Sequence, residues 1–396
     1  MKNNYFNIII PTRNRLVTLR HSLKTVLNQD YKNFKLIISD NNSADGTREF
    51  VESLNSTNIE YYNTGRGLSM SSNYEFALSK IKEGFVIVIG DDDGLLPSAL
   101  KNLNDIINRE NVLAISTCTA LYYWPGGSPF ENLLMIPRGK VKFERRKSAR
   151  FIKKVLEGDL DYSELPMLYT GGIVHSSLIA KAKNQQNKFY NSFTPDVYSG
   201  IAIASVVNEY LRIEKIFAIS GLSKFSNGQS QLGKNKDSSI AQVFFSENDI
   251  PFFKTLGDGK IKSIHFLTLE AYLQSSFLRL NDKIAMTRQF ELVISQAPNN
   301  IKNEIKNYLR EFCDFNPTLF SLSHFRIYAT TYKFKLRQFI KRFNKFIEWD
   351  MVFVQGKVNN VFEASEYINT RSYGLAETIN SKFKYLQFMI GRLSKR

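Results

Sequence analysis

Three consecutive aspartates, Asp91, Asp92 and Asp93, follow a short run of apolar residues over 85–89. Adjacent carboxylates repel one another, so such a triplet is costly unless a cation offsets its charge. Oxygen ligands suit Mg²⁺ or Mn²⁺, which commonly bridge protein carboxylates and substrate phosphates. The alternative is a solvated acidic turn, helped by the glycine and proline that follow. The position of the triplet after a buried strand favours the metal site.

Polar clusters also follow two earlier apolar runs, at residues 11–15 and 40–43. Asp40 offers acceptor oxygens for a base or a ribose, although an Asx turn or a helix cap would use the same residue. Surface arginines often have no binding role, but a guanidinium in a site can complement phosphate charge. The arginines that could do so here are Arg13, Arg15 and Arg66.

The elements that must position these clusters alternate between strand and helix over residues 1–117. Apolar runs predict strands at 6–10, 34–39, 58–62, 85–89 and 112–117. Apolar residues at helical spacing predict helices at 15–29, 45–54, 70–82 and 97–108. This alternation predicts an α/β fold with a mostly parallel sheet and helices on both faces. Ligands of such sheets bind beyond the carboxyl ends of the strands, so we expect the three polar clusters to lie together.

Four segments carry a resemblance to a known family. They are Ile-Ile-Ile-Pro-Thr-Arg-Asn-Arg at 8–15, Leu-Asn-Gln-Asp-Tyr at 27–31, Ser-Asp-Asn-Asn-Ser-Ala-Asp-Gly-Thr at 39–47, and Gly-Asp-Asp-Asp-Gly-Leu-Leu-Pro at 90–97. In this order they resemble the start of a family 2 glycosyltransferase of the kind that builds bacterial surface polysaccharides. The last segment resembles the acidic metal motif of that family. The resemblance covers residues 5 to about 110, thins over 120–235 and is absent beyond.

The resemblance implies a GT-A (Rossmann-like) fold, a nucleotide-sugar donor, a divalent cation (Mn²⁺ or Mg²⁺) and inversion at the anomeric carbon. By the same resemblance, Asp40 would contact the base and Asp92 is the best-aligned metal ligand. Asp91 and Asp93 have the literal Asp-x-Asp spacing, so the metal-binding pair among the three aspartates stays open. We assign Asp92 and Asp93 to the metal. The residues expected at the donor are Pro11, Thr12, Arg13, Asp40, Arg66, Asn73 and Asp91.

An inverting transfer also needs a general base that deprotonates the acceptor hydroxyl. The carboxylates available in the middle of the chain are Asp159, Asp161, Glu164 and Asp196. Asp196 directly precedes an apolar, helix-like segment at 201–211, and this resembles the place where family members hold the base. The alternative is an ordinary helix cap, because Pro195 followed by an aspartate is typical of a helix start. We predict that Asp196 is the catalytic base.

The length of 396 residues allows two or three domains. We predict a glycosyltransferase domain at 1–235, divided into a nucleotide-sugar-binding half at 1–117 and an acceptor half at 118–235. A helical region at 236–325 and basic amphipathic helices at 326–396 follow. Two cysteines allow neither a disulfide framework nor a cysteine zinc site, and no apolar run is long enough to span a bilayer. We therefore expect a cytoplasmic protein.

The net charge of +16 is concentrated in the C-terminal tail, where residues 326–396 carry +9. On a helix over 332–347, one face would be apolar and aromatic and the opposite face basic. This pattern is typical of a helix that lies on an anionic membrane, here the inner face of the plasma membrane. The alternative is a helix that packs its apolar face against its own protein or a second subunit, so a homo-oligomer stays open. No nucleic-acid-binding module is present.

Together these patterns predict an inverting glycosyltransferase that moves a sugar from a nucleotide-sugar donor, expected to be a UDP-sugar, to a lipid-linked glycan acceptor. Such a reaction belongs to O-antigen or capsule synthesis. Two alternatives are a non-catalytic scaffold that binds membranes or polyanions and a sugar nucleotidyltransferase. A nucleotidyltransferase is expected to carry a glycine-rich phosphate loop after the first strand, and residues 11–14 are not such a loop.

Overall fold

A computed structural model describes residues 2–126, 130–138, 141–225, 239–256, 263–279, 286–297, 302–315, 324–370 and 375–393. Within these residues, eleven strands form one mixed sheet. The strands are β1 (Phe6–Thr12), β2 (Phe34–Asp40), β3 (Ile59–Asn63), β4 (Phe85–Val88), β5 (Gly94–Leu95), β6 (Ala114–Tyr123), β7 (Leu133–Pro137), β8 (Phe143–Lys147), β9 (Gly172–His175), β10 (Glu209–Leu222) and β11 (Trp349–Phe353).

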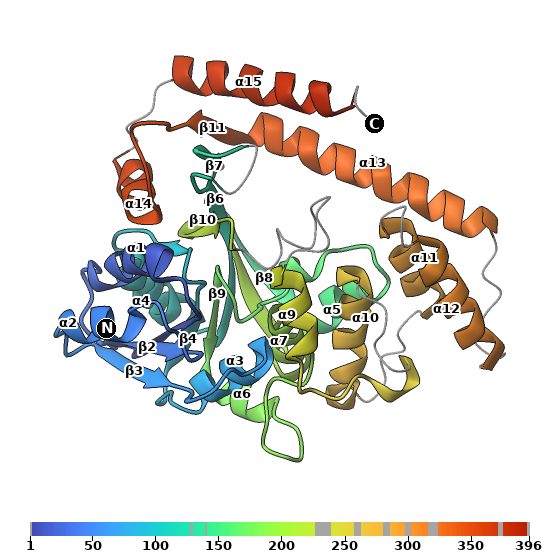
Figure 1. The fold of residues 1–396 in the computed structure, drawn as a ribbon, viewed down its shortest axis with the longest axis horizontal. Helices are drawn as coiled ribbons and strands as arrows, with labels where there is room; N and C mark the ends of the chain where they lie inside the picture. Colours follow the sequence, from blue (N-terminus) through green and yellow to red (C-terminus); the bar gives the residue numbers. More distant parts are fainter. Residues whose placement is uncertain are drawn as a thin grey trace.

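Helices flank the sheet and dominate the last third of the chain (Figure 1). They are α1 (Leu16–Leu27), α2 (Thr47–Ser53), α3 (Met70–Leu78), α4 (Ala99–Glu110), α5 (Ser148–Leu156), α6 (Ser176–Lys181), α7 (Pro195–Val206), α9 (Ser239–Ser246), α10 (Ile264–Gln274), α11 (Met286–Gln296), α12 (Lys302–Phe315), α13 (His324–Glu348), α14 (Val361–Asn369) and α15 (Leu375–Leu393). Short 3₁₀ turns are η1 (Tyr162–Glu164), η2 (Lys254–Leu256) and η3 (Ser276–Leu278).

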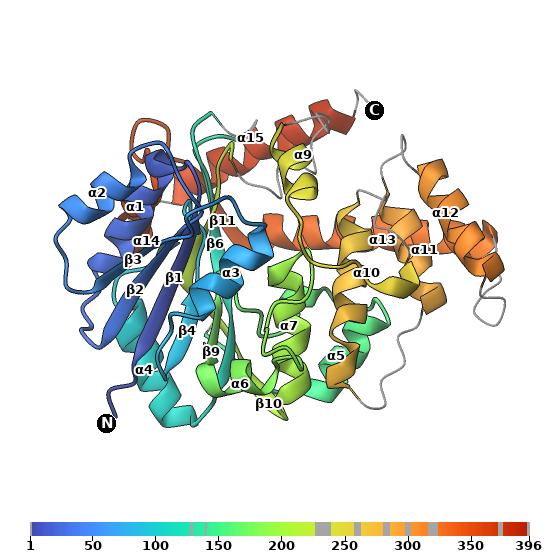
Figure 2. The same ribbon diagram turned by 60° about the horizontal axis from the view of Figure 1, so that its bottom comes forward.

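The predicted α/β class is confirmed, with parallel pairing in the order β3-β2-β1-β4. Strand β1 shows why these strands are almost wholly apolar. Ile8 and Ile10 pack with α1 and α4 on one face, whereas Ile9 packs with α3 and α7 on the other. Strands covered on both faces need apolar side chains in both directions. Figure 2 shows α1 and α2 on one side of β1–β3 and α3 on the other.

Beyond β4 the sheet is mixed, because β9 is antiparallel to both β4 and β6, and only β10 pairs in parallel with β6. Strand β10 corrects one prediction. The apolar segment at 201–211 is helical only to Val206, and β10 begins at Glu209. The bond from Ser148 N–H to the Asn208 carbonyl and the pairing of β10 with β6 and β8 satisfy its backbone in the extended form. Such long-range pairing overrides local helical spacing.

The C-terminal region is mainly helical, as predicted, and returns once to the sheet. Helices α10, α11 and α12 enclose a separate apolar cluster that includes Phe266, Phe290 and Leu309. After α13, strand β11 pairs antiparallel with β7, which attaches the tail to the sheet edge. The predicted boundary at 235 lies outside the described residues, so it stays a prediction. Among the helices that the structure describes, none has the length and hydropathy needed to cross a bilayer.

Candidate active site

A cavity of about 580 Å³ lies beyond the carboxyl ends of the parallel strands. Its walls come from the loop after β1, the start of α3, the loop after β4, the start of α7, the end of β10, and α9. The register of β1 on β2 pairs Thr12 with Asp40, which brings the ends of both strands to one edge. The Thr12 hydroxyl donates a hydrogen bond to Asp91 Oδ2 at 2.8 Å, so the first and third polar clusters meet there.

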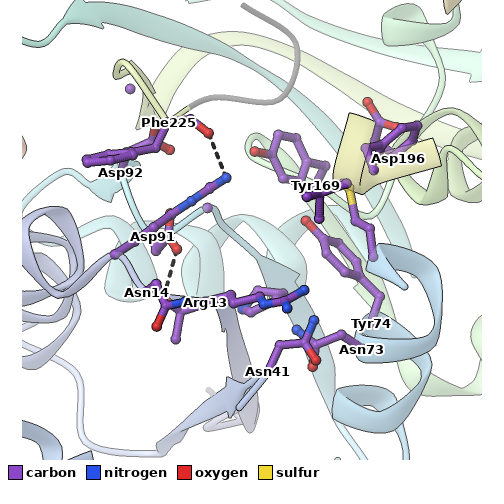
Figure 3. Close-up of a pocket in the computed structure, with 18 of the residues that line it drawn as sticks. Arg13, Asn14, Asn41, Asn73, Tyr74, Asp91, Asp92, Tyr169, Asp196 and Phe225 are labelled. Carbon is purple, nitrogen blue, oxygen red and sulfur yellow. Dashed lines mark hydrogen bonds and ion pairs between the residues drawn. The ribbon is translucent and has the colours of Figure 1, made fainter. Parts of the chain in front are cut away.

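Most residues predicted for the site line this cavity, although they are up to 185 positions apart in the sequence. Those that line it are Pro11, Thr12, Arg13, Asn73, Asp91, Asp92 and Asp196. Figure 3 shows Asp91 and Asp92 on one side of the drawn residues and Asp196 on the other. The remaining three predicted residues, Asp40, Arg66 and Asp93, are not among the lining residues.

Asp40 is buried, and polar groups of its own domain surround its carboxylate. Its Oδ1 accepts the backbone N–H of Ser43 at 2.8 Å, as in an Asx turn. Its Oδ2 accepts the Tyr61 hydroxyl at 2.5 Å, and burial together with this carboxylate raises the pKa of Tyr61 to about 12. Arg66 is exposed, outside the lining of the cavity. The base-contacting role of Asp40 and the phosphate-binding role of Arg66 therefore stay predictions.

The acidic motif is buried, and each of its carboxylates has a different set of partners. Asp91 contacts Thr12 and the Arg15 guanidinium, whose Nη1 lies 3.2 Å from Asp91 Oδ1. Asp92 Oδ2 accepts the Ser223 hydroxyl at 2.6 Å, and within the described residues its Oδ1 accepts no hydrogen bond. Asp92 therefore lines the cavity with one carboxylate oxygen still available.

Asp93 instead links the loop after β4 to neighbouring segments. Its Oδ2 accepts the backbone N–H of Gly90 at 2.8 Å and the Thr170 hydroxyl, and its Oδ1 accepts the backbone N–H of Gly221 at 2.7 Å. A Cβ atom at position 221 would stand 1.8 Å from the carbonyl oxygen of Asp92, so only glycine allows this close approach. The arrangement holds the acidic motif rigidly against β10.

The electrostatics of the motif favour a bound cation. Burial raises the pKa of Asp91, Asp92 and Asp93, and repulsion between the carboxylates adds to the rise at Asp92 and Asp93. Arg15 counteracts this only in part, mainly at Asp91. In the part of the chain that the structure describes, no group of three or more acidic, histidine or cysteine side chains is arranged to hold a metal ion alone. The residues fit a Mg²⁺ or Mn²⁺ ion that takes one or two carboxylates and completes its shell with a diphosphate.

Two arginines line the cavity beside the motif, and both contact later parts of the chain. Arg13 pairs with Glu247, which follows α9, at 2.6 Å between Nη1 and Oε2. Arg15 donates from Nη2 to the carbonyl of Phe225 at 2.6 Å, in addition to its contact with Asp91. The loop after β10 and α9 therefore complete the wall opposite the sheet edge.

Asp196 is the only predicted base that lines the cavity. It lies in the first turn of α7, and burial raises the pKa of its carboxyl group above the ordinary value. Its charge, together with the charges of the acidic motif, adds to the effect of burial in raising the pKa of Tyr74 and Tyr169. Both tyrosines line the cavity, so their hydroxyl groups experience the negative charge of the acidic motif and of Asp196 (Figure 3).

The other three carboxylates have partners elsewhere. Asp159 pairs with Arg337 of α13 at 3.0 Å, and Glu164 pairs with Arg146 at 2.8 Å. Asp161 accepts the backbone N–H of Ser163 and caps η1. The placement of these residues favours Asp196 as the base.

Arg15, which the sequence offered as a phosphate-binding arginine, also lines the cavity. Several further lining residues were not assigned to the site from the sequence. They are Asn14, Asn41, Leu68, Met70, Tyr74, Gly90, Tyr169, Ser220, Gly221, Leu222, Phe225, Val243, Phe244 and Glu247. Some had a signal, because Asn41 belongs to a polar cluster and 220–228 has the composition of a flexible loop. The part of that loop over 226–228 lies outside the described residues. Tyr169 and Glu247 had none, since only long-range packing brings them to the cavity.

Comparisons with known proteins find similarity to glycosyltransferases. Residues 7–159 match the model of glycosyl transferase family 2. A curated protein from Campylobacter jejuni subsp. jejuni serotype O:2, GalNAc(5)-diNAcBac-PP-undecaprenol β-1,3-glucosyltransferase, is 24% identical over 330 residues. The match covers 78% of this chain and 98% of that protein.

Among solved structures, S. aureus TarS 1-349 is similar, with a TM-score of 0.45 and 14% identity over 84% of this chain and 91% of that one. The mannosyltransferase PcManGT from Pyrobaculum calidifontis, solved with GDP-Man and Mn²⁺, gives a TM-score of 0.41 and 12% identity, over 84% and 87% of the two chains. The family match spans β1 to the loop after α5 and includes the acidic motif. Residues 7–159 of this chain therefore form a glycosyl transferase family 2 domain.

Proposed function

We propose that this protein transfers a sugar from a UDP-sugar to a lipid-linked glycan, with inversion at the anomeric carbon. One observation carries the proposal: Asp92 of the acidic motif and Asp196 line the same cavity. A displacement that inverts the sugar needs a leaving-group site and a base on opposite sides of the reacting carbon. The acidic motif and Asp196 have the chemistry of these two groups.

The donor end is formed by the loop after β1 and by α3. Pro11, Thr12 and Asn73 line it, and Asn73 Oδ1 is fixed by the Ser39 hydroxyl at 2.6 Å. Arg13 and Arg15 supply two guanidinium groups for the diphosphate. Because both are already paired with carboxylates, a diphosphate adds negative charge to an acidic site. This charge balance supports a donor that binds together with a cation.

Asp92 would hold a Mn²⁺ or Mg²⁺ ion through its available Oδ1, with Asp91 beside it. A divalent cation bound there would offset the negative charge that develops on the departing diphosphate. Asp93 is the less suitable ligand, because backbone N–H groups and the Thr170 hydroxyl occupy its carboxylate. Its contacts fix the loop that carries Asp92.

Asp196 would accept the proton of the acceptor hydroxyl at its carboxylate. Burial raises its pKa, so its carboxylate is a stronger base than that of an exposed aspartate. Tyr74 and Tyr169 line the same cavity as Asp196.

The related protein supports a proposal for the acceptor and for the cellular location. The name of the Campylobacter jejuni relative describes transfer to a glycan on undecaprenyl diphosphate. A lipid-linked acceptor of this kind would bring the enzyme to the inner face of the plasma membrane as a peripheral protein. The proposed pathway is therefore the assembly of a bacterial surface polysaccharide.

A thermal-shift screen of UDP-, GDP- and dTDP-sugars, each with and without Mn²⁺, tests the donor. A ligand that binds the native state raises the apparent Tm, so the true donor is expected to stabilise the protein mainly when Mn²⁺ is present. Transfer to a synthetic polyprenyl-diphosphate glycan then tests the reaction. If Asp92→Asn and Asp196→Asn both retained full transfer, while Asp159→Asn served as the matched control, the proposed site would be wrong.

A further inference from the structure

Helix α13 exposes its apolar face to solvent. Its large apolar side chains at spacings of three and four residues form one stripe: Tyr328, Tyr332, Leu336, Phe339, Ile340, Phe343 and Ile347. From Tyr332 to Ile347 their exposed fractions lie between 46% and 65%. The sequence alone allowed this face to pack on the protein itself. Within the described residues, no part of the protein covers this face.

The opposite side of α13 accounts for this orientation. Thr330 is buried and donates a hydrogen bond to Glu291 of α11, and Phe346 packs in the cluster beneath β7 and β11. Arg337 holds the helix to the loop before η1 through Gly158 O at 2.9 Å and Asp159 Oδ1 at 3.0 Å. These contacts attach the other face of α13 and its C-terminal end to the protein. The aromatic stripe is therefore turned outward.

Helix α15 adds a second exposed row. The side chains of Ile379, Phe383 and Leu386 have exposed fractions of 45%, 62% and 40%. Their spacing of four and three residues places them on one face of the helix. The Lys382 ammonium of α15 donates to the carbonyl of Ile347 at 3.2 Å, which joins this helix to the C-terminal turn of α13. Figure 1 shows the two helices along one edge of the molecule.

Basic side chains of α13 lie beside and opposite the stripe. Lys333, Lys335, Lys341 and Arg342 are exposed, and within the part of the chain that the structure describes none of them forms an ion pair. The only acidic residue of α13 is Glu348, at its end. Unpaired cations beside exposed aromatic side chains are complementary to a surface that is apolar inside and anionic outside.

We propose that the outward faces of α13 and α15, defined by the stripe and by Ile379, Phe383 and Leu386, form a docking surface for an anionic lipid bilayer. The apolar side chains enter the region between headgroups and acyl chains, and the basic side chains meet lipid phosphates. The surface does not depend on the transfer reaction, since none of its residues lines the cavity. Arg337 and Asp159 connect α13 to the loop before η1.

The test is co-sedimentation of the full chain with vesicles of phosphatidylglycerol and phosphatidylcholine, and with vesicles of phosphatidylcholine alone. We expect binding to the anionic vesicles, weakened at high salt. The double variant Phe339→Ser/Phe343→Ser should weaken binding by about tenfold or more, since two large apolar side chains no longer enter the bilayer. Lys341→Glu/Arg342→Glu should abolish the preference for anionic vesicles.

Two control variants keep the test specific. Lys101→Glu/Lys181→Glu makes the same charge change on exposed residues of α4 and α6 and should bind vesicles as the unchanged protein does. Val17→Ser removes an exposed apolar side chain of α1 and should also have no effect. All variants should retain the circular dichroism spectrum and the cation-dependent donor response, which separates this proposal from the proposed function.

Three outcomes would overturn the proposal. One is the absence of binding to anionic vesicles by the unchanged protein. A second is equal loss of binding in the control variants. The third is a concentration-dependent dimer, seen by analytical ultracentrifugation, that the Phe339→Ser/Phe343→Ser variant dissociates while vesicle binding is unchanged, because the stripe would then cover a second copy of the chain.

Discussion

The guanidinium of Arg13 and the carboxylate of Glu247 form an ion pair in the wall of the cavity, with Nη1 2.6 Å from Oε2. The two residues are 234 positions apart and come from opposite sides of the site. Both side chains keep about a third of their surface exposed. Glu247 therefore pairs with the cation that we propose binds the donor diphosphate, and it adds a negative charge of its own.

Glu247→Gln should strengthen the binding of UDP. The neutral amide competes less for Arg13 and repels the diphosphate less, which should lower the Kd about two- to fivefold for a partly exposed pair. Isothermal titration calorimetry with Mn²⁺ present measures this. Glu157→Gln removes the charge of a partly exposed glutamate at the end of α5 and is the matched control. Weaker binding by Glu247→Gln would contradict the idea that this carboxylate competes with the donor.

Substitutions of Asp92 and of Asp93 should have different effects. Asp92→Asn should remove the extra thermal stabilisation that a nucleotide gains from Mn²⁺, because the cavity-lining carboxylate is lost. Asp93→Asn should lower the free energy of unfolding by about 1–3 kcal/mol, because its amide nitrogen replaces one of the two accepting oxygens and would face the N–H group of either Gly90 or Gly221. Denaturant unfolding and nucleotide thermal shifts measure the two effects. A result with the two variants exchanged would make Asp93 the ligand.

The pH dependence of kcat should report Asp196. A base acts only when ionised, so activity should fall as the pH falls through the pKa of Asp196, which burial raises above 3.8. Asp196→Asn should lower kcat by about 10²- to 10⁴-fold. The nearby Asp161 contributes to the rise, so Asp161→Asn should move the acid limb to lower pH and leave the maximal rate intact. An acid limb that Asp161→Asn does not move would point to another group.

Glu270 should make stability depend on pH. Burial raises its pKa to about 7, although Ser192 and Gln274 donate hydrogen bonds to it. Between its ordinary pKa of 4.5 and about 7, the folded protein binds more protons at this site than the unfolded chain. The contribution of Glu270 to the free energy of unfolding is therefore at its full value below about pH 4.5. It falls as the pH rises to about 7, by at most about 3 kcal/mol.

Glu270→Gln should flatten that part of the pH profile, because the amide does not titrate. Urea unfolding at pH 5 and pH 8 measures the change. Glu144→Gln, in which the replaced side chain is half-exposed and paired with Arg146, is the control and should leave the profile as it is. A profile that is equally steep in Glu270→Gln and in the unchanged protein would show that Glu270 is ionised in the folded state at both pH values.

The sequence predicted the first half of the fold well, because strands β1, β2 and β4 are largely apolar on both faces and helices α1 and α3 have apolar residues at helical spacing. The segment at 118–235 was predicted poorly. Strands such as β8 (Phe143–Lys147), with Phe-Glu-Arg-Arg-Lys, carry little apolar periodicity and exist because β10 supplies their hydrogen-bond partners. Long-range pairing of this kind leaves no local pattern to recognise.

The features of the site also divide into those that the sequence predicted and those that only the tertiary structure decided. The order of residue types alone determined that the acidic motif, Thr12 and Arg13 would meet, since parallel strands bring their carboxyl ends to one edge. The tertiary structure decided that Asp92 lines the cavity while Asp93 is held by backbone N–H groups, and that Asp196, rather than Asp159, lines it as well. It also decided that the aromatic stripe of α13 faces outward. Amphipathic spacing shows that a helix has an apolar face, but only the packing of the other face determines which surface covers it.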